Sequence, residues 1–213
     1  MVIRLGIIGT AGRREDGTRM SRVVYKAMAE EVYRLIQVEW RLAPSNIQLV
    51  SGGAAWSDHL AVDMLLAGAK KTKWANRPAF HSLKLYLAAS WDSPNQCYSE
   101  VQRGAYNTGK ISNWYHHKFT ERMQEHGLKD YHSLERLHRC IQQGRQGRLP
   151  VIAEIGSDFF KRNQNIASNV DYLIAFTWAS GPIPKKGGTL YTWEHTQLPD
   201  SRKTHVSLAT LNK

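Results

Sequence analysis

Short apolar runs alternate along this chain with longer stretches in which apolar residues recur every three or four positions. A short run bounded by turn residues is typical of a buried strand, and the wider spacing is typical of an amphipathic helix. The expected strands occupy residues 2–8, 47–50, 83–89 and 170–176. The expected helices occupy residues 21–40, 57–68, 159–167 and 189–196. This alternation predicts an α/β fold with a mostly parallel sheet and right-handed crossovers.

Residues 91–149 break the alternation, because they are polar, aromatic and rich in His, Gln and Arg. Helical candidates lie at residues 93–107, 113–126 and 133–143. In the first of these, Ser93 suits an N-cap and Pro94 suits the first helical position. The segment is interpreted as a helical insertion or lid within a single domain spanning residues 1–213. The tail, residues 205–211, is expected to add an edge strand.

Glycine-rich segments stand where an expected strand gives way to a helix. They occupy residues 6–13, 50–58 and 186–194. Glycine lets the backbone approach a ligand closely, and a helix N-terminus offers free N–H groups and positive potential to an anion. Three such turns in one small domain predict a ligand that carries phosphate.

The first turn supplies Gly9, Thr10, Gly12 and Arg13 as phosphate-binding candidates. It has no Gly-Lys-Ser/Thr ending and no clean Gly-x-Gly-x-x-Gly pattern, so neither a Walker loop nor dinucleotide oxidoreduction is supported. The alternative is that any first strand-to-helix turn requires glycine.

The second turn, Ser51-Gly52-Gly53-Ala54-x-x-x-Asp58, is more specific. Its glycines clear the space above the strand end, and Ser51 supplies a hydroxyl. Asp58 is expected to accept a hydrogen bond from a ribose hydroxyl or a base. The alternative is that Asp58 merely complements the helix dipole.

Two later segments complete the candidate site. Arg162 and Asn163 stand near the start of a helix, where a guanidinium can bind phosphate through paired, charge-assisted bonds. In the third turn we expect ligand contacts from Gly187, Gly188, Thr189 and Thr192. Glu194 is a candidate general acid/base or ribose ligand. The alternatives are an ordinary surface arginine and an ordinary exposed helix glutamate.

A net charge of +11 and a pI near 9.8 favour an anionic partner, such as nucleotide or nucleic acid. The alternative is a surface charged for solubility, since the basic residues are scattered. The densest cluster contains Lys70, Lys71 and Lys73. Aromatic residues of the insertion offer base stacking or, alternatively, core packing.

The two cysteines form no Cys-x-x-Cys pair, and the histidines form no metal-ligand pattern. We therefore expect no metal, no cofactor and a reducing, cytoplasmic location. The N-terminus lacks a signal-peptide pattern, and no apolar run is long enough to span a bilayer, so no membrane partner is expected.

Taken in order, these motifs resemble the SLOG superfamily. The resemblance rests on Gly6-Ile7-Ile8-Gly9-x-x-Gly12-Arg13, on Ser51-Gly52-Gly53-Ala54-x-x-x-Asp58, on Arg162-Asn163-x-x-Ile166-Ala167 and on Gly187-Gly188-Thr189. This Rossmann-like group includes the DNA-processing protein DprA, the LOG cytokinin-activating hydrolases and nucleotide-sensing domains of prokaryotic defence systems. The resemblance covers residues 3–89 and 159–196 and implies a Rossmann-like three-layer fold.

The resemblance also implies candidate functions. LOG hydrolases carry Pro-Gly-Gly-x-Gly-Thr-x-x-Glu, and Gly187, Gly188 and Glu194 keep that spacing, with Arg162 as the upstream arginine. This implies binding of a nucleotide or nucleotide-derived ligand, with cleavage of its N-glycosidic bond by Glu194 and Arg162. The alternatives are a non-catalytic signal-nucleotide receptor or sequestering protein, phage or defence related, and DprA-like binding of single-stranded nucleic acid. A homo-oligomer is expected from the same resemblance.

Overall fold

The computed structural model describes residues 1–69, 78–101 and 106–211. A six-stranded sheet forms its centre, in the order β6-β3-β2-β1-β7-β8, and every neighbouring pair runs parallel. The strands are β1 (Ile3–Gly9), β2 (Ile47–Ser51), β3 (Ser82–Leu87), β6 (Val151–Ile155), β7 (Tyr172–Thr177) and β8 (Lys203–Ser207). A separate small hairpin consists of β4 (Trp91–Asp92) and β5 (Cys97–Tyr98).

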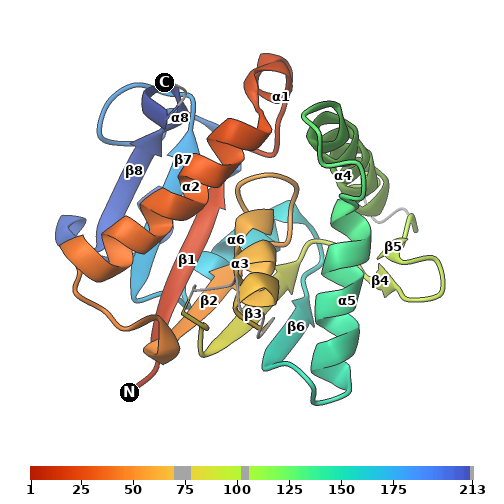
Figure 1. The fold of residues 1–213 in the computed structure, drawn as a ribbon, viewed down its shortest axis with the longest axis horizontal. Helices are drawn as coiled ribbons and strands as arrows, with labels where there is room; N and C mark the ends of the chain where they lie inside the picture. The colour runs from red at the N-terminus through yellow and green to blue at the C-terminus, as the bar shows by residue number, and fades with distance from the viewer. Residues whose placement is uncertain (70–77, 102–105, 212–213) are drawn as a thin grey trace.

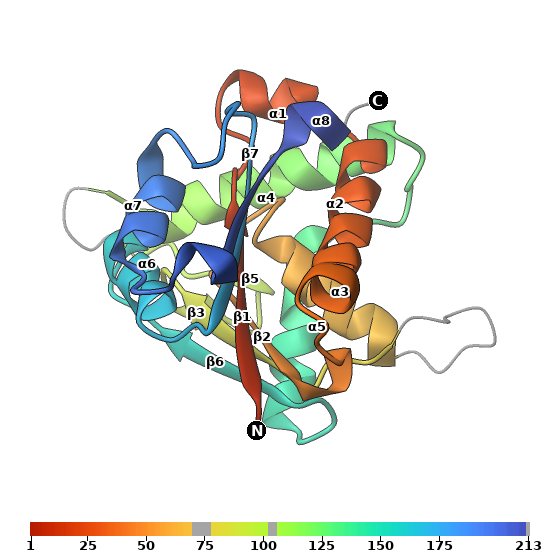
Figure 2. The same cartoon turned by 90° about the vertical axis from the view of Figure 1, so that its left-hand side faces the viewer.

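Helices cover both faces of this sheet (Figure 1, Figure 2). One face carries α2 (Arg22–Arg34), α3 (His59–Ala69) and α5 (Ser133–Arg145), and the other carries α6 (Phe159–Ala167) and α7 (Gly187–His195). The remaining helices are α1 (Glu15–Arg19), α4 (Thr108–Glu125) and α8 (Leu208–Leu211). The structure therefore confirms the predicted Rossmann-like three-layer α/β fold.

The order of the strands reverses its direction at β1. From β1 the chain adds β2, β3 and β6 in one direction, and then returns to the other side of β1 for β7 and β8. In open parallel sheets, ligands bind outside the carboxyl ends of the strands where the direction reverses. Gly9, Ser51 and Thr177 end β1, β2 and β7 at this edge.

The apolar periodicity located most elements. Helix α6 has the predicted bounds, and Ser21 caps α2 by accepting a hydrogen bond from the Val24 N–H. Helix α2 continues into a π-helical segment, Leu35–Glu39, and this segment also lies within the predicted helix at residues 21–40. The tail forms an edge strand as predicted, but β8 ends at Ser207 and α8 follows it.

The predicted helix at residues 93–107 is wrong. Its described residues hold the turn and second strand of the β4–β5 hairpin instead of a helix. Asp92 accepts hydrogen bonds from the backbone and side-chain nitrogens of Asn95, and this local bonding stabilises the turn. The side chain of Asn113 then pairs with both backbone groups of Tyr98. These tertiary bonds override the helical N-cap signal of Ser93 and Pro94.

Sequence reasoning also missed β6. This strand lies at the sheet edge beside β3, and Ile152 and Ile155 remain more than half exposed. Its sequence, Val151-Ile152-Ala153-Glu154-Ile155, is apolar at four of five positions, and this short run after Pro150 was the available signal for a strand.

Described residues between 91 and 149, in the hairpin and in α4 and α5, join the same hydrophobic core as helices α2 and α3. Phe119 of α4 is fully buried, and its ring centroid lies 4.2 Å from that of Trp56 and 5.3 Å from that of Tyr25. From α5, Leu137 is also fully buried. Helices α4 and α5 are therefore packed structural elements of the domain.

We expect Phe119→Ala to destabilise the protein by about 3–5 kcal/mol, because it leaves a cavity at the junction of three elements. The measurement is chemical denaturation followed by circular dichroism. Trp114→Ala is the matched control on the same helix, since Trp114 is 53% exposed, and it should change stability by about 0.5 kcal/mol or less. Equal, small losses in the two variants would contradict the packing role of α4.

Candidate functional site

Residues from all the predicted motifs meet at the carboxyl edge of the sheet. We call this group the glycine-turn cluster. Its members are Gly9, Gly52, Ser57, Asp58, Arg162, Asn163, Gly188 and Thr189. They come from the ends of β1 and β2 and from the beginnings of α3, α6 and α7. The predicted convergence of these segments is present in the structure.

Asp58 lies at the centre of the cluster, directly before α3, and is only 5% exposed. Burial raises the pKa of its carboxyl group. The neighbouring Arg162 guanidinium and hydrogen bonds from the backbone N–H groups of Gly9 and Gly52 oppose that rise. Asp58 therefore joins the ends of β1 and β2, a role that neither sequence interpretation described.

Position 52 has no room for a side chain, because the side chains of Asp58 and Arg162 both lie against the Gly52 backbone. A Cβ at this position would lie 2.5 Å from Oδ2 of Asp58 and 2.8 Å from Cδ of Arg162. The guanidinium then reaches Asn163, whose Oδ1 accepts hydrogen bonds from Nε at 3.1 Å and Nη2 at 2.9 Å. Arg162 and Asn163, both selected from the sequence, are thus held beside the β2–α3 turn.

Asn163 connects Arg162 with the N-terminus of α7. A Cβ at Gly188 would lie 2.6 Å from Nδ2 of Asn163, so this amide lies directly against the backbone of the helix start. Lys186 occupies the N-cap position, and its side chain makes no capping hydrogen bond. The first-turn N–H groups of α7 lack intrahelical partners and point their positive potential toward this edge.

Ser57 was not a predicted site residue, yet its hydroxyl is the polar group left open in the cluster. Ser57 is fully buried, and its Oγ has no hydrogen-bond partner among the described residues. Oγ lies 2.7 Å from the position that a Cβ of Gly9 would take. Thr189 approaches the same glycine from α7 and donates a hydrogen bond to its carbonyl oxygen at 3.1 Å. Polar groups from the β2–α3 turn and from α7 therefore lie against Gly9.

Other predicted ligand residues serve the protein's own backbone. The Ser51 hydroxyl donates to the Asp58 carbonyl at 2.6 Å and accepts from the Gly53 N–H at 3.1 Å, which holds the β2–α3 turn in shape. Thr192 is buried and donates to the Gly188 carbonyl within α7. Gly53 adopts the left-handed backbone region, with φ of 63°.

The far part of the first turn points toward the insertion. Thr10 donates to Asp16 and accepts from the Gly12 N–H, so its hydroxyl is used within the loop. A Cβ at Gly12 would collide with the Trp56 ring, and Arg13 extends over Tyr115 of α4 at 5.9 Å. In this structure Gly12 and Arg13 are not brought to Arg162.

Glu194 is not brought to the cluster either. It is exposed and makes no hydrogen bond or ion pair with any described residue. Thr192 and Trp193 are the buried residues of α7, and Glu194 follows them as an exposed residue. Gly187 lies at the exposed start of the same helix. The predicted pairing of Glu194 with Arg162 is therefore absent from this geometry.

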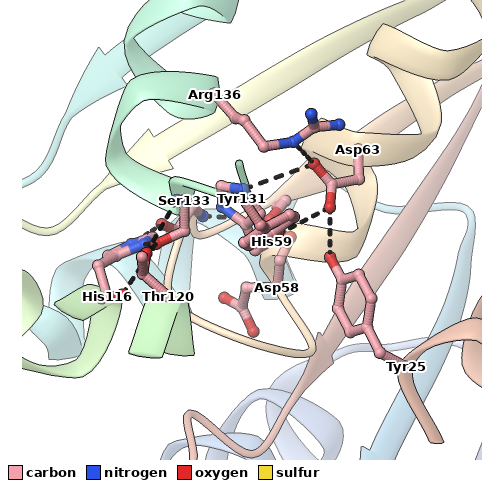
Figure 3. Close-up of polar contacts among 11 residues, drawn as sticks. Tyr25, Asp58, His59, Asp63, His116, Thr120, Tyr131, Ser133 and Arg136 are labelled. Atoms are coloured by element: carbon pink, nitrogen blue, oxygen red, sulfur yellow. Dashed lines mark hydrogen bonds and ion pairs between the residues drawn. The ribbon is translucent and has the colours of Figure 1, made fainter. Parts of the chain in front are cut away.

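A second polar group lies behind the cluster, between α3 and the insertion helices (Figure 3). We call it the buried polar network. Its centre is Asp63, which accepts hydrogen bonds from the Tyr25 hydroxyl at 3.0 Å, the Tyr131 hydroxyl at 2.8 Å and Nε of Arg136 at 2.5 Å. Burial and then the Asp63 charge raise the pKa of both tyrosines well above their ordinary value.

His116 connects this network to the β2–α3 turn. Its Nε2 lies 3.0 Å from the Gly53 carbonyl, which can only accept, so Nε2 carries the proton of the neutral ring. Nδ1 lies 3.1 Å from the Ser133 hydroxyl. The Tyr98 hydroxyl donates to the same carbonyl at 2.9 Å. Burial, followed by the charge that His59 can carry, lowers the pKa of His116 to about 3.

His59 is fully buried beside this network and has no hydrogen bond to either ring nitrogen among the described residues. Its Nε2 lies 3.6 Å from Asp63, and burial lowers its pKa to about 3. Sequence reasoning treated His59 as an isolated histidine. The available signal was its spacing of four residues from Asp63, which puts both on one face of α3.

Other candidate features of the chain lie outside the glycine-turn cluster. Lys70, Lys71 and Lys73 lie outside the described residues. A cavity of about 250 Å³ lies away from the cluster, between β6 and α5, and is lined mainly by apolar side chains. Cys97 and Cys140 are both free. No helix of the described chain is long and apolar enough to cross a membrane.

Comparison with known proteins identifies one family. The chain is 30% identical over 208 residues to the uncharacterized protein R261 of Acanthamoeba polyphaga mimivirus, and the alignment covers 97% of each chain. The chain therefore belongs to the same family as this viral protein. No protein-family model and no solved structure matches the chain.

The two buried histidines predict acid sensitivity. Their folded-state pKa values of about 3 lie below the ordinary value near 6.5, so the unfolded chain binds more protons between these limits. Stability should therefore be full above about pH 6.5 and fall as the pH falls toward 3, by about 1.4 kcal/mol per pH unit for each histidine. Denaturation curves recorded across this range measure the slope.

His59→Leu should remove one histidine's share of that slope, because leucine fills a similar apolar space and cannot be protonated. His81→Gln is the control, since His81 is exposed. An unchanged slope in His59→Leu would show that His59 is not a source of the acid sensitivity.

Proposed function

We propose that the glycine-turn cluster binds a nucleotide or nucleotide-derived ligand, with a phosphate at the N-terminus of α7. The observation that carries the proposal is the chain of contacts from Gly52 through Arg162 and Asn163 to Gly188. These contacts put a guanidinium, a side-chain amide and an open helix start at one edge of the sheet. That combination favours an anion with several oxygen atoms.

Unused donors remain for such an anion. An arginine side chain has five N–H donors, and Arg162 uses Nε and Nη2 on Asn163. Nη1 makes no hydrogen bond within the described part of the chain. Gly187 and Gly188 are exposed and place no side chain of their own over the first turn of α7, and exposed Lys185 and Lys186 precede them. Both backbone and charge thus favour phosphate here.

The orphaned Ser57 hydroxyl supports a ligand at the same place. A buried hydroxyl without a partner costs free energy, about 1–3 kcal/mol, unless something satisfies it. Ser57 directly precedes Asp58 in the chain, and its Oγ lies against the backbone of Gly9. A ligand oxygen at this edge would complete its hydrogen bonding.

The resemblance to the SLOG superfamily agrees with this assignment, because the segments that carry the resemblance are the ones that supply the cluster. The proposal gives Asp58 and Arg162 binding and positioning roles. It assigns no catalytic step to Glu194, which is exposed and makes no hydrogen bond or ion pair with a described residue. Recognition of a nucleotide without cleavage is therefore the form of the hypothesis that the geometry favours.

The test is isothermal titration of the protein with nucleoside 5′-monophosphates and diphosphates, with the ligand recovered afterwards and analysed by mass spectrometry. We expect binding and recovery of intact ligand. Arg162→Gln should weaken binding at least tenfold, because a charge-assisted phosphate contact contributes about 1.5–3 kcal/mol.

Arg139→Gln is the matched control. Arg139 lies on α5, is paired with Glu135 and is about as exposed as other surface arginines. Its loss should leave affinity unchanged. Equal weakening in both variants would indicate a nonspecific charge effect, and failure of every nucleotide and of ribose 5-phosphate to bind would refute the proposal.

A further inference from the structure

A row of aromatic rings lies on α6 and α7 beside the glycine-turn cluster. Phe160 of α6 is 55% exposed, although it is one of the large apolar side chains of the protein. Its ring centroid lies 4.7 Å from that of Tyr191. The Tyr191 ring in turn stacks on His195 at 3.8 Å, with an interplanar angle of 23°. We call these three residues the aromatic row.

Helical geometry puts this row next to the proposed phosphate position. Gly188, Tyr191 and His195 follow the spacing i, i+3 and i+7, so they share one side of α7. Phe160 and Asn163 are likewise three residues apart on α6. The two helices thus touch at Asn163–Gly188 and again at Phe160–Tyr191. The rise along a helix over three residues is about 4.5 Å, a distance that one sugar ring can bridge.

The aromatic row has no evident role in the core of the protein. Trp193, on the same helix, is buried in the apolar cluster between the sheet and α6, whereas Phe160 leaves more than half of its surface in water. His195 is exposed as well, and its Nδ1 bonds only the Tyr191 carbonyl. Lys161, next to Phe160, is also exposed. An exposed aromatic surface with a flanking positive charge suits a flat, conjugated ring attached to an anion.

We propose that the aromatic row holds the base of the bound nucleotide, with Phe160 as the stacking residue, so that the ligand class is base-bearing nucleotides and excludes base-free sugar phosphates. This inference rests on the proposed function, since it needs the phosphate at the start of α7. The stack reads the face of the base, so it accepts purines and pyrimidines alike. Within the aromatic row, the groups that can hydrogen-bond the edge of a base are the Tyr191 hydroxyl and the ring of exposed His195.

The experiment compares AMP, GMP, CMP and UMP with ribose 5-phosphate, which has the same sugar and phosphate without a base. All four nucleotides should bind at least tenfold more tightly than ribose 5-phosphate. Phe160→Ala should weaken nucleotide binding about tenfold and leave ribose 5-phosphate unchanged, because stacking contributes only when a base is present. Phe160→Tyr keeps the ring and should retain most of the affinity.

The outcomes separate the two proposals. Ribose 5-phosphate binding as tightly as the nucleotides, or an unchanged nucleotide affinity in Phe160→Ala, would overturn the base assignment and leave the phosphate site standing. Equal weakening of both ligand types in Phe160→Ala would show a structural effect and also overturn it. Absence of binding by all five probes would refute the phosphate site and the base assignment together.

Discussion

The burial of the Asp58 carboxylate is the constraint on which the carboxyl edge of this protein depends. A carboxylate that is 5% exposed must be compensated, and here the compensation comes from Arg162 and from the backbone N–H groups at the ends of β1 and β2. Gly9 and Gly52 are therefore constrained twice, as donors and as positions without room for a side chain. Any ligand at this edge meets a surface that the protein has already organised.

The β2–α3 turn connects the glycine-turn cluster with the insertion. One end of the turn contributes Gly52 and Asp58 to the glycine-turn cluster, while the Gly53 carbonyl accepts hydrogen bonds from Tyr98 and His116 on the other side. The buried polar network around Asp63 then connects α3 with α2 and α5 (Figure 3). Residues 91–149 are consequently bound into the domain through polar contacts as well as through Phe119 and its aromatic neighbours.

Polar side chains are buried at two places in this fold, in the buried polar network and in the glycine-turn cluster. In the buried polar network the Asp63 carboxylate has three hydrogen-bonding partners, as expected where a charge stabilises structure. In the glycine-turn cluster, Ser57 remains unpartnered and the start of α7 remains uncapped by a side chain. Because His59 beside the buried polar network also has no hydrogen-bond partner among the described residues, the proposed ligand site depends on the exposed start of α7 and on Arg162 beside it.

The amino-acid sequence alone determined the alternation of strands and helices and the places where glycine is needed, because both depend on local periodicity and backbone freedom. It also selected Gly52, Asp58, Arg162 and Asn163, which the structure brings together. Tertiary packing decided the rest. The hairpin at residues 91–98 formed in place of a predicted helix because Asn113 bonds both backbone groups of Tyr98. Pairing with β3 made residues 151–155 an edge strand, and burial of Thr192 and Trp193 left Glu194 exposed, without a bond to Arg162.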